Sequence, residues 1–220
     1  MAAIFDMDGL LINTDPVIWV ESMHEVAAQY QVDVTTELLQ HTKGLRIYEV
    51  TEFWNEHFQW NDSAKSEEIA ENIVDAVLAN SYKKGKVMPG VIALLEDLRK
   101  AEIPLGVATS SPERLCSQLL SFFNLSSYFS VVSTADTCIS GKPHPEVYLQ
   151  CASKLSVLPW KCVAFEDSVN GMIAAKAARM KAVVVPANHQ MNDSKFGLAD
   201  QKVASLLEFN VDDYIQLLSQ

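Results

Sequence analysis

Short apolar runs alternate with segments of helical periodicity over residues 88–186, and this alternation constrains the fold more than any other feature of the chain. A further apolar run, at residues 2–5, opens the chain. Regular alternation of strand and helix predicts right-handed βαβ units, and therefore a parallel sheet covered by helices. The apolar runs of the alternating region are 103–108, 129–132, 162–165 and 182–185, and helical patterns lie at 89–101, from 112 onward, at 145–155 and at 171–180.

Residues 15–86 interrupt this series directly after the first apolar run and its turn. They are helical in pattern, have no β-rich run and contain three of the four tryptophans of the chain. We interpret them as an inserted domain, so that residues 1–14 and 87–220 together form the core domain. The predicted fold class is therefore α/β, a Rossmann-like parallel sheet core flanked by helices, with an inserted all-helical cap domain.

The composition favours a packed core and argues against nucleic-acid binding. Hydrophobic residues make up 49% of the 220 residues, enough for one substantial domain that carries a smaller one. The formal net charge is −11 and the pI is about 4.8, whereas nonspecific nucleic-acid binding requires a basic surface. A small anionic substrate would therefore have to be held by a site that is locally positive.

The cysteines and the apolar runs indicate a reducing compartment and no membrane segment. Cys116, Cys138, Cys151 and Cys162 form no CxxC pair and match no zinc-binding spacing. All but Cys138 lie in apolar patterns typical of small core residues, which is compatible with a reducing cytoplasm. The N-terminus lacks the pattern of a signal peptide, and no apolar stretch approaches the ~18 residues that span a bilayer. We expect a cytoplasmic protein that is a monomer.

Polar side chains that carry chemistry follow four of the predicted strands. In a parallel sheet the carboxyl ends of the strands share one edge, and open α/β sheets bind ligands there. Taken alone, most of these sets could belong to turns or helix caps, where Asp, Ser and Thr are common, and Lys142 could be a solvated loop residue. That explanation does not account for their convergence on one edge. The sets are Asp6 and Asp8; Thr109, Ser110 and Ser111; Lys142; and Glu166 and Asp167.

The grouped acids predict a site for a metal ion and a phosphate. Several carboxylates in one cleft raise one another's pKa values, and a divalent cation such as Mg²⁺ removes this conflict. Lys142, a hydroxyl group and the backbone N–H groups at the start of the helix at Pro112 would hold the phosphate oxygens. Ser111 is expected to cap that helix. Asp6 would then face phosphorus as a nucleophile.

In this order the polar segments resemble the four motifs of the haloacid dehalogenase (HAD) superfamily. The resemblance covers nearly the whole chain and includes a helical cap inserted after the first motif. Asp8 resembles the phosphotransferase branch of the superfamily, because the dehalogenases lack this second aspartate. Gly44-Leu45-Arg46 and the run from Glu166 to Gly171 are similar to bacterial sugar-phosphate phosphatases. The four segments are Asp6-Met7-Asp8-Gly9, Thr109-Ser110, Lys142-Pro143 and Glu166-Asp167.

The resemblance implies a role for each residue that would touch the phosphoryl group. Asp6 would attack phosphorus and become an aspartyl-phosphate. Asp8 would protonate the oxygen of the leaving sugar and then activate a water molecule against the phosphoenzyme. Thr109, the backbone of Ser110, and Lys142 would hold the phosphoryl group that is transferred.

The resemblance also implies a Mg²⁺ cofactor and a role for the cap. The metal would be bound by Asp6, by Asp167 and by the backbone carbonyl of Asp8, with Glu166 acting either directly or through water. Arg46 would reach the substrate from the cap, although it could equally be a surface arginine. Whether Lys43 or a tryptophan of the cap contacts the sugar is left open.

The function that the resemblance implies is a Mg²⁺-dependent phosphatase for small sugar phosphates of the hexose or hexitol 6-phosphate type, such as 2-deoxyglucose 6-phosphate. One alternative is a transferase similar to β-phosphoglucomutase, in which a histidine tends to occur early in the first cap helix. This chain has Val17-Ile18-Trp19 there, and its nearest histidine is His24. The other alternative is a phosphate-binding protein without activity, which would lack one of the core groups, whereas all are present.

Overall fold

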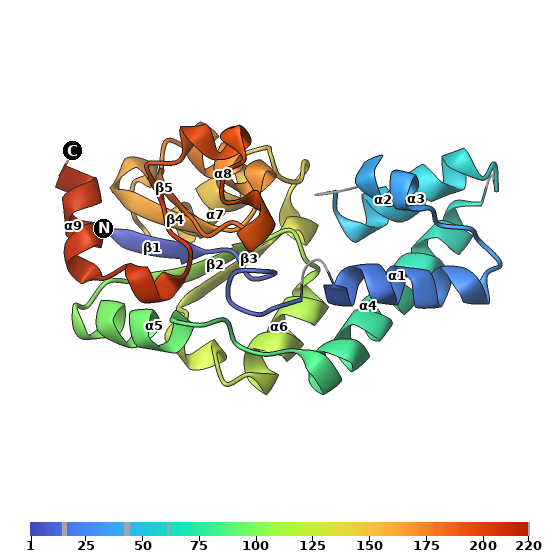
Figure 1. Cartoon of the computed structure of the whole chain (residues 1–220), viewed down its shortest axis with the longest axis horizontal. Coiled ribbons are helices and arrows are strands. Elements are labelled where there is room, and N and C mark those ends of the chain that lie inside the picture. The colour runs from blue at the N-terminus through green and yellow to red at the C-terminus, as the bar shows by residue number, and fades with distance from the viewer. Residues whose placement is uncertain (15–16, 42–44, 61, 220) are drawn as a thin grey trace. The chain divides into compact units, whose positions relative to one another are not determined.

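The computed structural model describes residues 1–14, 17–41, 45–60 and 62–219 and divides into two compact units (Figure 1). The first unit combines Met1–Ile12 with Val87–Gln220, and the second is Asn13–Lys86. Asp15 and Pro16, where we expected the inserted domain to begin, lie outside the described residues, as do Lys43 and Gly44.

The first unit is built on a six-stranded parallel sheet with the order β3-β2-β1-β4-β5-β6, which confirms the predicted fold class. In the centre, Phe5 of β1 lies level with Val107 of β2 and with Phe165 of β4. The residues that follow these positions therefore leave the sheet at the same edge. The strands are β1 (Ala2–Phe5), β2 (Leu105–Thr109), β3 (Val131–Thr134), β4 (Cys162–Glu166), β5 (Lys181–Val184) and β6 (Gln201–Lys202).

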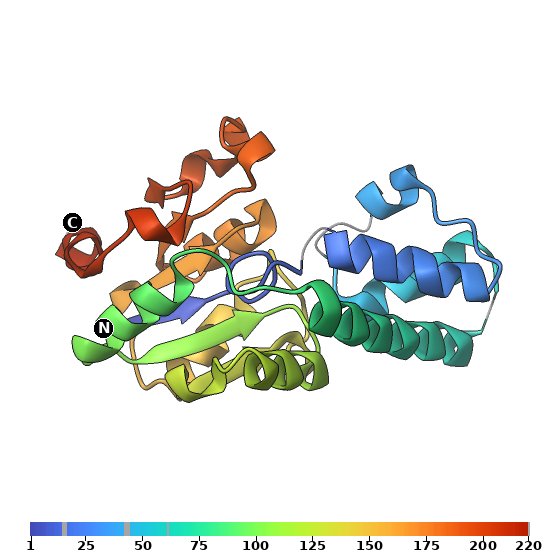
Figure 2. The ribbon, with the colours of Figure 1, turned by 60° about the horizontal axis from the view of Figure 1, so that its bottom comes forward.

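Helices follow the strands in the order that the alternating pattern predicts. Helices α7 and α8 pack against each other and against the sheet, and α5 and α9 form a second contacting pair (Figures 1 and 2). The strand expected at 129–132 begins only at Val131. The short 3-10 helix Ser126–Tyr128 lies before it, with Phe129 as its C-cap. The α-helices of this unit are α5 (Val91–Lys100), α6 (Glu113–Phe122), α7 (Glu146–Lys154), α8 (Val169–Ala177) and α9 (Val211–Ser219).

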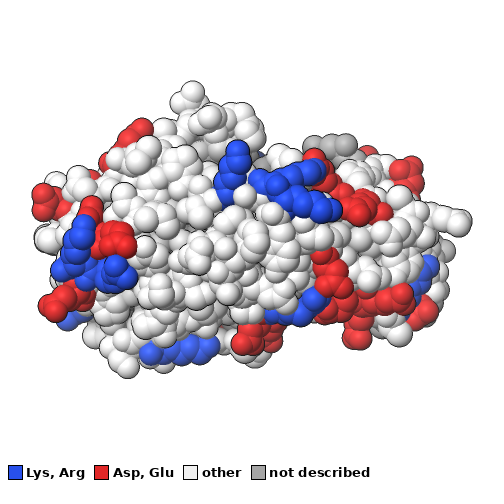
Figure 3. Space-filling model, turned by 90° about the horizontal axis from the view of Figure 1, so that it is seen from below, with Lys and Arg blue, Asp and Glu red and all other residues white. Residues whose placement is uncertain are grey.

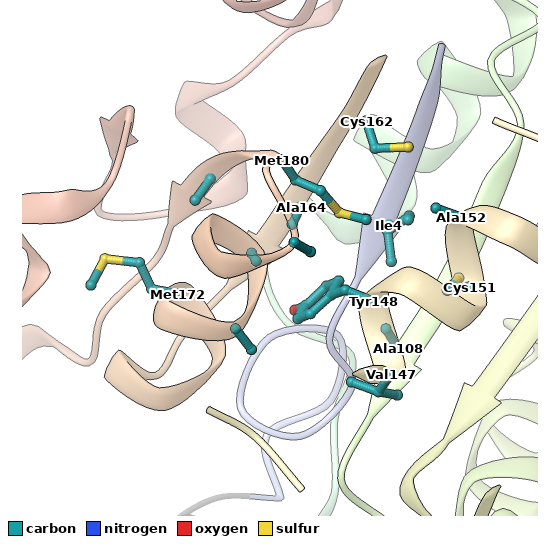
Figure 4. Packing of buried hydrophobic residues seen from close by; sticks show 14 of the residues in the cluster. Ile4, Ala108, Val147, Tyr148, Cys151, Ala152, Cys162, Ala164, Met172 and Met180 are labelled. Carbon is teal, nitrogen blue, oxygen red and sulfur yellow. The ribbon is translucent and has the colours of Figure 1, made fainter. Parts of the chain in front are cut away.

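Small side chains allow α7 and α8 to lie close to the sheet (Figure 4). Ile4 and Ala164 from the strands meet Cys151 and Met172 from the helices in one buried cluster. Helix α8 contributes mainly alanines to it, which bring the helix backbone near the strands. Cys116, Cys138, Cys151 and Cys162 are all buried and free. The cluster thus fixes the helices whose first residues lie at the edge of the sheet where the acids gather.

The described residues of the second unit form four helices, α1 (Val17–Gln29), α2 (Thr36–His41), α3 (Ile47–His57) and α4 (Ser63–Lys84). The long helix α4 packs against both α1 and α3. The side chain of Trp54 is completely buried, so this tryptophan belongs to the core of the unit and cannot form a wall for a sugar.

The surface agrees with the acidic composition. On the face shown in Figure 3, Asp and Glu side chains gather on the second unit, as expected for a chain with a net charge of −11.

Among the described residues, no helix is both long and apolar enough to cross a membrane.

Candidate active site

The turn after β1 places two aspartates at the edge of the sheet. The Asp6 N–H donates to the carbonyl oxygen of Phe165 at 3.0 Å, which extends the pairing of β1 with β4 by one residue. Gly9 then takes a left-handed conformation with φ 81°, and its N–H donates to the Ile12 carbonyl. This tight reversal of the chain leaves Asp6 almost fully buried and Asp8 partly exposed.

The side chain of Lys142 connects three of the strand ends. Its Nζ donates to Asp6 Oδ1 at 2.6 Å, to Glu166 Oε1 at 2.6 Å and to the Ala108 carbonyl oxygen at 2.9 Å. An ammonium group has three N–H donors, so each has an acceptor. Lys142 is only 6% exposed and lies in a pocket of oxygen atoms. The structure therefore brings Asp6, Lys142 and Glu166 into direct contact.

Burial and charge perturb both partners of this ion pair. Burial raises the pKa of Asp6, and the charges of Glu166 and Asp8 raise it further, so that the attraction of Lys142 does not compensate. Burial would lower the pKa of Lys142, but the charges of Asp6 and Glu166 outweigh this effect and raise it above its ordinary value. The ammonium group of Lys142 therefore stays charged. Its single positive charge does not balance the negative charges of the carboxylates around it.

Glu166 is completely buried, and both of its oxygens accept hydrogen bonds. Oε1 accepts from Lys142 and from the Tyr148 hydroxyl, each at 2.6 Å, and Oε2 accepts from the Ser168 hydroxyl at 3.1 Å. The carboxylate lies directly against Gly171, where an added Cβ would be 1.9 Å from Oε1. The sequence predicts Glu166 as a metal ligand, and the structure in addition makes it the acceptor that holds Lys142 in place.

Tyr148 is a residue of the site that the sequence reasoning missed. It lies on the buried face of α7, its hydroxyl donates to Glu166, and its ring centroid is 4.9 Å from the Lys142 Nζ. Helical periodicity counts such a tyrosine as an apolar core residue. The feature of the sequence that could have indicated its role is the hydroxyl group, because a buried tyrosine hydroxyl usually requires a hydrogen-bond partner.

Asp8 interacts with the residues that follow β2. The Ser111 hydroxyl donates to Asp8 Oδ2 at 2.6 Å, and the Thr109 hydroxyl donates to the same oxygen at 3.4 Å. Ser110 lies between these two residues and is partly exposed. Thus the structure also places Thr109 and Asp8, predicted from separate motifs, beside each other.

The expectation that Ser111 caps the next helix is wrong. Helix α6 begins at Glu113 after Pro112, and no side chain of the N-cap residue bonds its first turn. Instead the Glu113 N–H donates to Asp136 Oδ2 at 2.6 Å, a contact from the segment after β3 that the sequence reasoning did not anticipate. This N–H is therefore occupied by a carboxylate of the chain and not by a phosphate as we expected.

Three carboxylates form a group that fits a metal ion. Oxygen atoms of Asp6, Glu166 and Asp167 all lie within 4.8 Å of one another. Oxygen donors suit a hard divalent cation such as Mg²⁺, and its charge would counteract the burial and the neighbouring carboxylates that raise the pKa of Asp6. The side chain of Asp8 is not part of this group, so only its backbone carbonyl remains as the ligand that the resemblance implies.

Arg46 belongs to the second unit and precedes helix α3. Its backbone N–H donates to Glu49 Oε2 at 2.8 Å, and its guanidinium donates to Glu49 Oε1 at 2.6 Å. Burial would raise the pKa of Glu49, but the hydrogen bonds and charge of Arg46 lower it. Arg46 is therefore held at the start of α3 with its side chain partly exposed.

Comparisons with known proteins show what the chain as a whole is similar to. The model of the haloacid dehalogenase-like hydrolases matches residues 3–185. Hexitol phosphatase B of Escherichia coli K12 is 40% identical over 98% of this chain and 96% of its own length. The phosphorylated carbohydrates phosphatase of Thermotoga maritima is 34% identical over 88% of each chain. The crystal structure of CbbY from Rhodobacter sphaeroides in complex with phosphate is 28% identical, with a TM-score of 0.80 over 94% of this chain and 95% of that one.

The Tyr148→Phe substitution tests the support of Glu166. It removes one hydrogen bond to a buried carboxylate without changing the shape of the core, so we expect the free energy of unfolding to fall by about 1.5–3 kcal/mol. Urea unfolding of both proteins measures the change. Tyr128→Phe is the matched control, because the Tyr128 hydroxyl donates to Glu96, which is partly exposed, so its loss should have a much smaller effect. Equal losses for the two variants would show that the hydroxyl of Tyr148 gives no special support to Glu166.

Proposed function

Because the chain belongs to the haloacid dehalogenase-like hydrolase family, we propose that it is a Mg²⁺-dependent phosphatase of small sugar phosphates that acts through an aspartyl-phosphate on Asp6. The observation that carries the proposal is the buried carboxylate of Asp6, held at 2.6 Å by Lys142 with Asp8 two residues away. A fixed carboxylate beside an ammonium group is suited to attack a phosphate ester and to keep the transferred phosphoryl group in place.

In the first proposed step, a carboxylate oxygen of Asp6 bonds to phosphorus while the bond from phosphorus to the sugar oxygen breaks. Asp8 gives its proton to that sugar oxygen, so the sugar leaves as a neutral alcohol. Thr109 and Lys142 hold the oxygens of the phosphoryl group, and the backbone of Ser110 contributes its N–H. For this contact Lys142 turns toward the phosphoryl group one of the three N–H donors that the protein accepts in the structure. Little beyond positioning and neutralisation of charge is required for phosphoryl transfer.

In the second proposed step, a water oxygen bonds to phosphorus and the bond from phosphorus to Asp6 breaks. Asp8, now ionised, takes a proton from this water. Inorganic phosphate leaves, and both aspartates return to their initial protonation states.

Mg²⁺ would be held by Asp6, by Asp167 and by the backbone carbonyl of Asp8. Glu166 would bind it either directly or through water. When bound, the cation would neutralise the carboxylates and the phosphate oxygens. Two observations support this metal site: three carboxylates lie close together, and the pKa of Asp6 is raised.

The proposed substrates are hexose or hexitol 6-phosphates, such as 2-deoxyglucose 6-phosphate. The names of two relatives support this class, one being a hexitol phosphatase and the other a phosphatase of phosphorylated carbohydrates. We propose that Arg46 contributes to the choice of substrate, because its planar guanidinium suits a phosphate or a pair of sugar hydroxyls. Glu49 fixes the orientation of that guanidinium.

The Asp6→Asn substitution tests the nucleophile. Asparagine keeps the shape of the side chain but is a poor nucleophile, so we expect the protein to fold and kcat to fall by about a thousandfold or more. The measurement is release of inorganic phosphate from hexitol and hexose 6-phosphates, with circular dichroism as the check on folding. A folded Asp6→Asn variant that keeps a sizeable fraction of the activity would contradict the assignment.

Removal of metal tests the cofactor. Treatment with excess EDTA should stop phosphate release, and added Mg²⁺ should restore it, because the carboxylates of Asp6, Glu166 and Asp167 would otherwise repel the substrate phosphate. Isothermal titration of the metal-free protein with Mg²⁺ measures binding independently of turnover. Full activity in excess EDTA would rule out the proposed cofactor.

The Arg46→Ala substitution tests the choice of substrate. We expect KM to rise by roughly tenfold for the preferred sugar phosphate, as for the loss of one charged contact. Arg99→Ala is the matched control, since Arg99 also pairs with a glutamate three residues away but lies on the surface of the first unit. An unchanged KM and unchanged preference among substrates would show that Arg46 is a surface residue without a role in substrate choice.

An assay of phosphate release from glucose 1-phosphate tests the mutase alternative, because a mutase would convert this ester and release little phosphate.

A further inference from the structure

The hydroxyl of Ser111 is buried and points at the carboxylate of Asp8. Ser111 is 5% exposed, and its Oγ donates to Asp8 Oδ2 at 2.6 Å. This residue lies beyond the Thr109-Ser110 motif, in the connection between β2 and α6. Hydrogen bonds to a carboxylate at this distance are among the stronger ones in proteins and restrict the direction of both side chains.

Among the residues that the structure describes, Asp8 is the partner to which the Ser111 hydroxyl donates. A serine before a helix ordinarily caps it, but the first turn of α6 receives its side-chain contact from Asp136. The Ser111 backbone N–H is used separately, since it donates to Thr109 Oγ1 at 3.1 Å. The Ser111 hydroxyl therefore donates to Asp8 and does not cap the helix.

The two hydroxyls near Asp8 differ in strength. Thr109 reaches Asp8 Oδ2 at 3.4 Å, close to the limit of a hydrogen bond, whereas Ser111 reaches the same oxygen at 2.6 Å. In the proposed reaction Thr109 turns to an oxygen of the phosphoryl group and gives up its long contact. Ser111 then remains to hold Asp8.

We propose that Ser111 is a positioning residue that fixes the carboxyl group of Asp8 for its proton transfers, an inference that rests on the proposed function. Ser111 touches neither the phosphoryl group nor the metal in this role and acts only through Asp8. Its loss should therefore slow a reaction in proportion to how much the leaving group needs a proton. An alkoxide needs one, whereas a stable phenolate leaves without it.

The test compares two substrates of one enzyme. The ratio kcat/KM reports the steps up to transfer of the phosphoryl group to Asp6, so it isolates proton donation to the leaving group. For Ser111→Ala we expect kcat/KM to fall by about tenfold or more on a hexitol 6-phosphate, and by much less on p-nitrophenyl phosphate. Ser111→Thr, which keeps the hydroxyl, should recover most of the loss on the hexitol phosphate.

Two controls separate this role from a structural one. Ser117→Ala removes a hydroxyl from the exposed side of α6, where it donates to the Arg114 carbonyl, and should leave kcat/KM for both substrates unchanged. Thermal unfolding of each variant checks the fold. If Ser111→Ala does not fold, Ser111→Cys, with a weaker donor of similar size, replaces it in the same comparison.

Each outcome decides the proposal. A loss confined to the hexitol phosphate and recovered by Ser111→Thr supports it. Equal losses on both substrates, or no loss on either, overturn it while leaving the proposed function intact, because the wild-type protein still releases phosphate. A wild-type protein that hydrolyses neither ester overturns the proposed function, and this inference falls with it.

Discussion

The rest of the site depends on one ammonium group. Lys142 Nζ reaches Asp6 directly after β1, the Ala108 carbonyl in β2 and Glu166 at the end of β4, so a single cation connects three neighbouring strands. Burying these charges requires a large desolvation free energy, and their mutual attraction offsets it only in part. The cluster is therefore poorly explained as a device for stability. It is well explained by chemistry that needs a fixed carboxylate shielded from water.

The contacts around this ion pair show how far local sequence determines the site. The edge at which Asp6, Thr109 and Glu166 meet follows from the alternation of strand and helix, because parallel strands end on the same side. The fold class and the family could thus be predicted from the sequence, and the structure and comparisons confirm both. The roles of the individual residues and of the second unit remain predictions.

What could not be predicted depends on side chains that are distant in the sequence. Ser111 has the pattern of a helix cap, but Asp136 from another segment takes the helix end, and Asp8 takes the serine hydroxyl. Tyr148 fits an apolar helical face, and the reason for its hydroxyl is the carboxylate of Glu166 at the end of β4, which the sequence of α7 does not reveal. A hydroxyl group selects its partner from whatever the tertiary fold brings near, and periodicity along one segment contains no information about that choice.

The long separations within the site have a consequence for how the protein forms. Lys142 and Asp6 are 136 residues apart, and Asp8 and Ser111 are 103 apart, so these bonds close only after the central strands have paired. Before that point each charge remains hydrated and separate, and a partly folded chain has no site at all. During synthesis Asp6 and Asp8 leave the ribosome long before Glu166 does, so the cluster of Asp6, Lys142 and Glu166 cannot close until Glu166 has also emerged. The two aspartates therefore acquire the partners that make them a site only when a much later segment of the chain has been made.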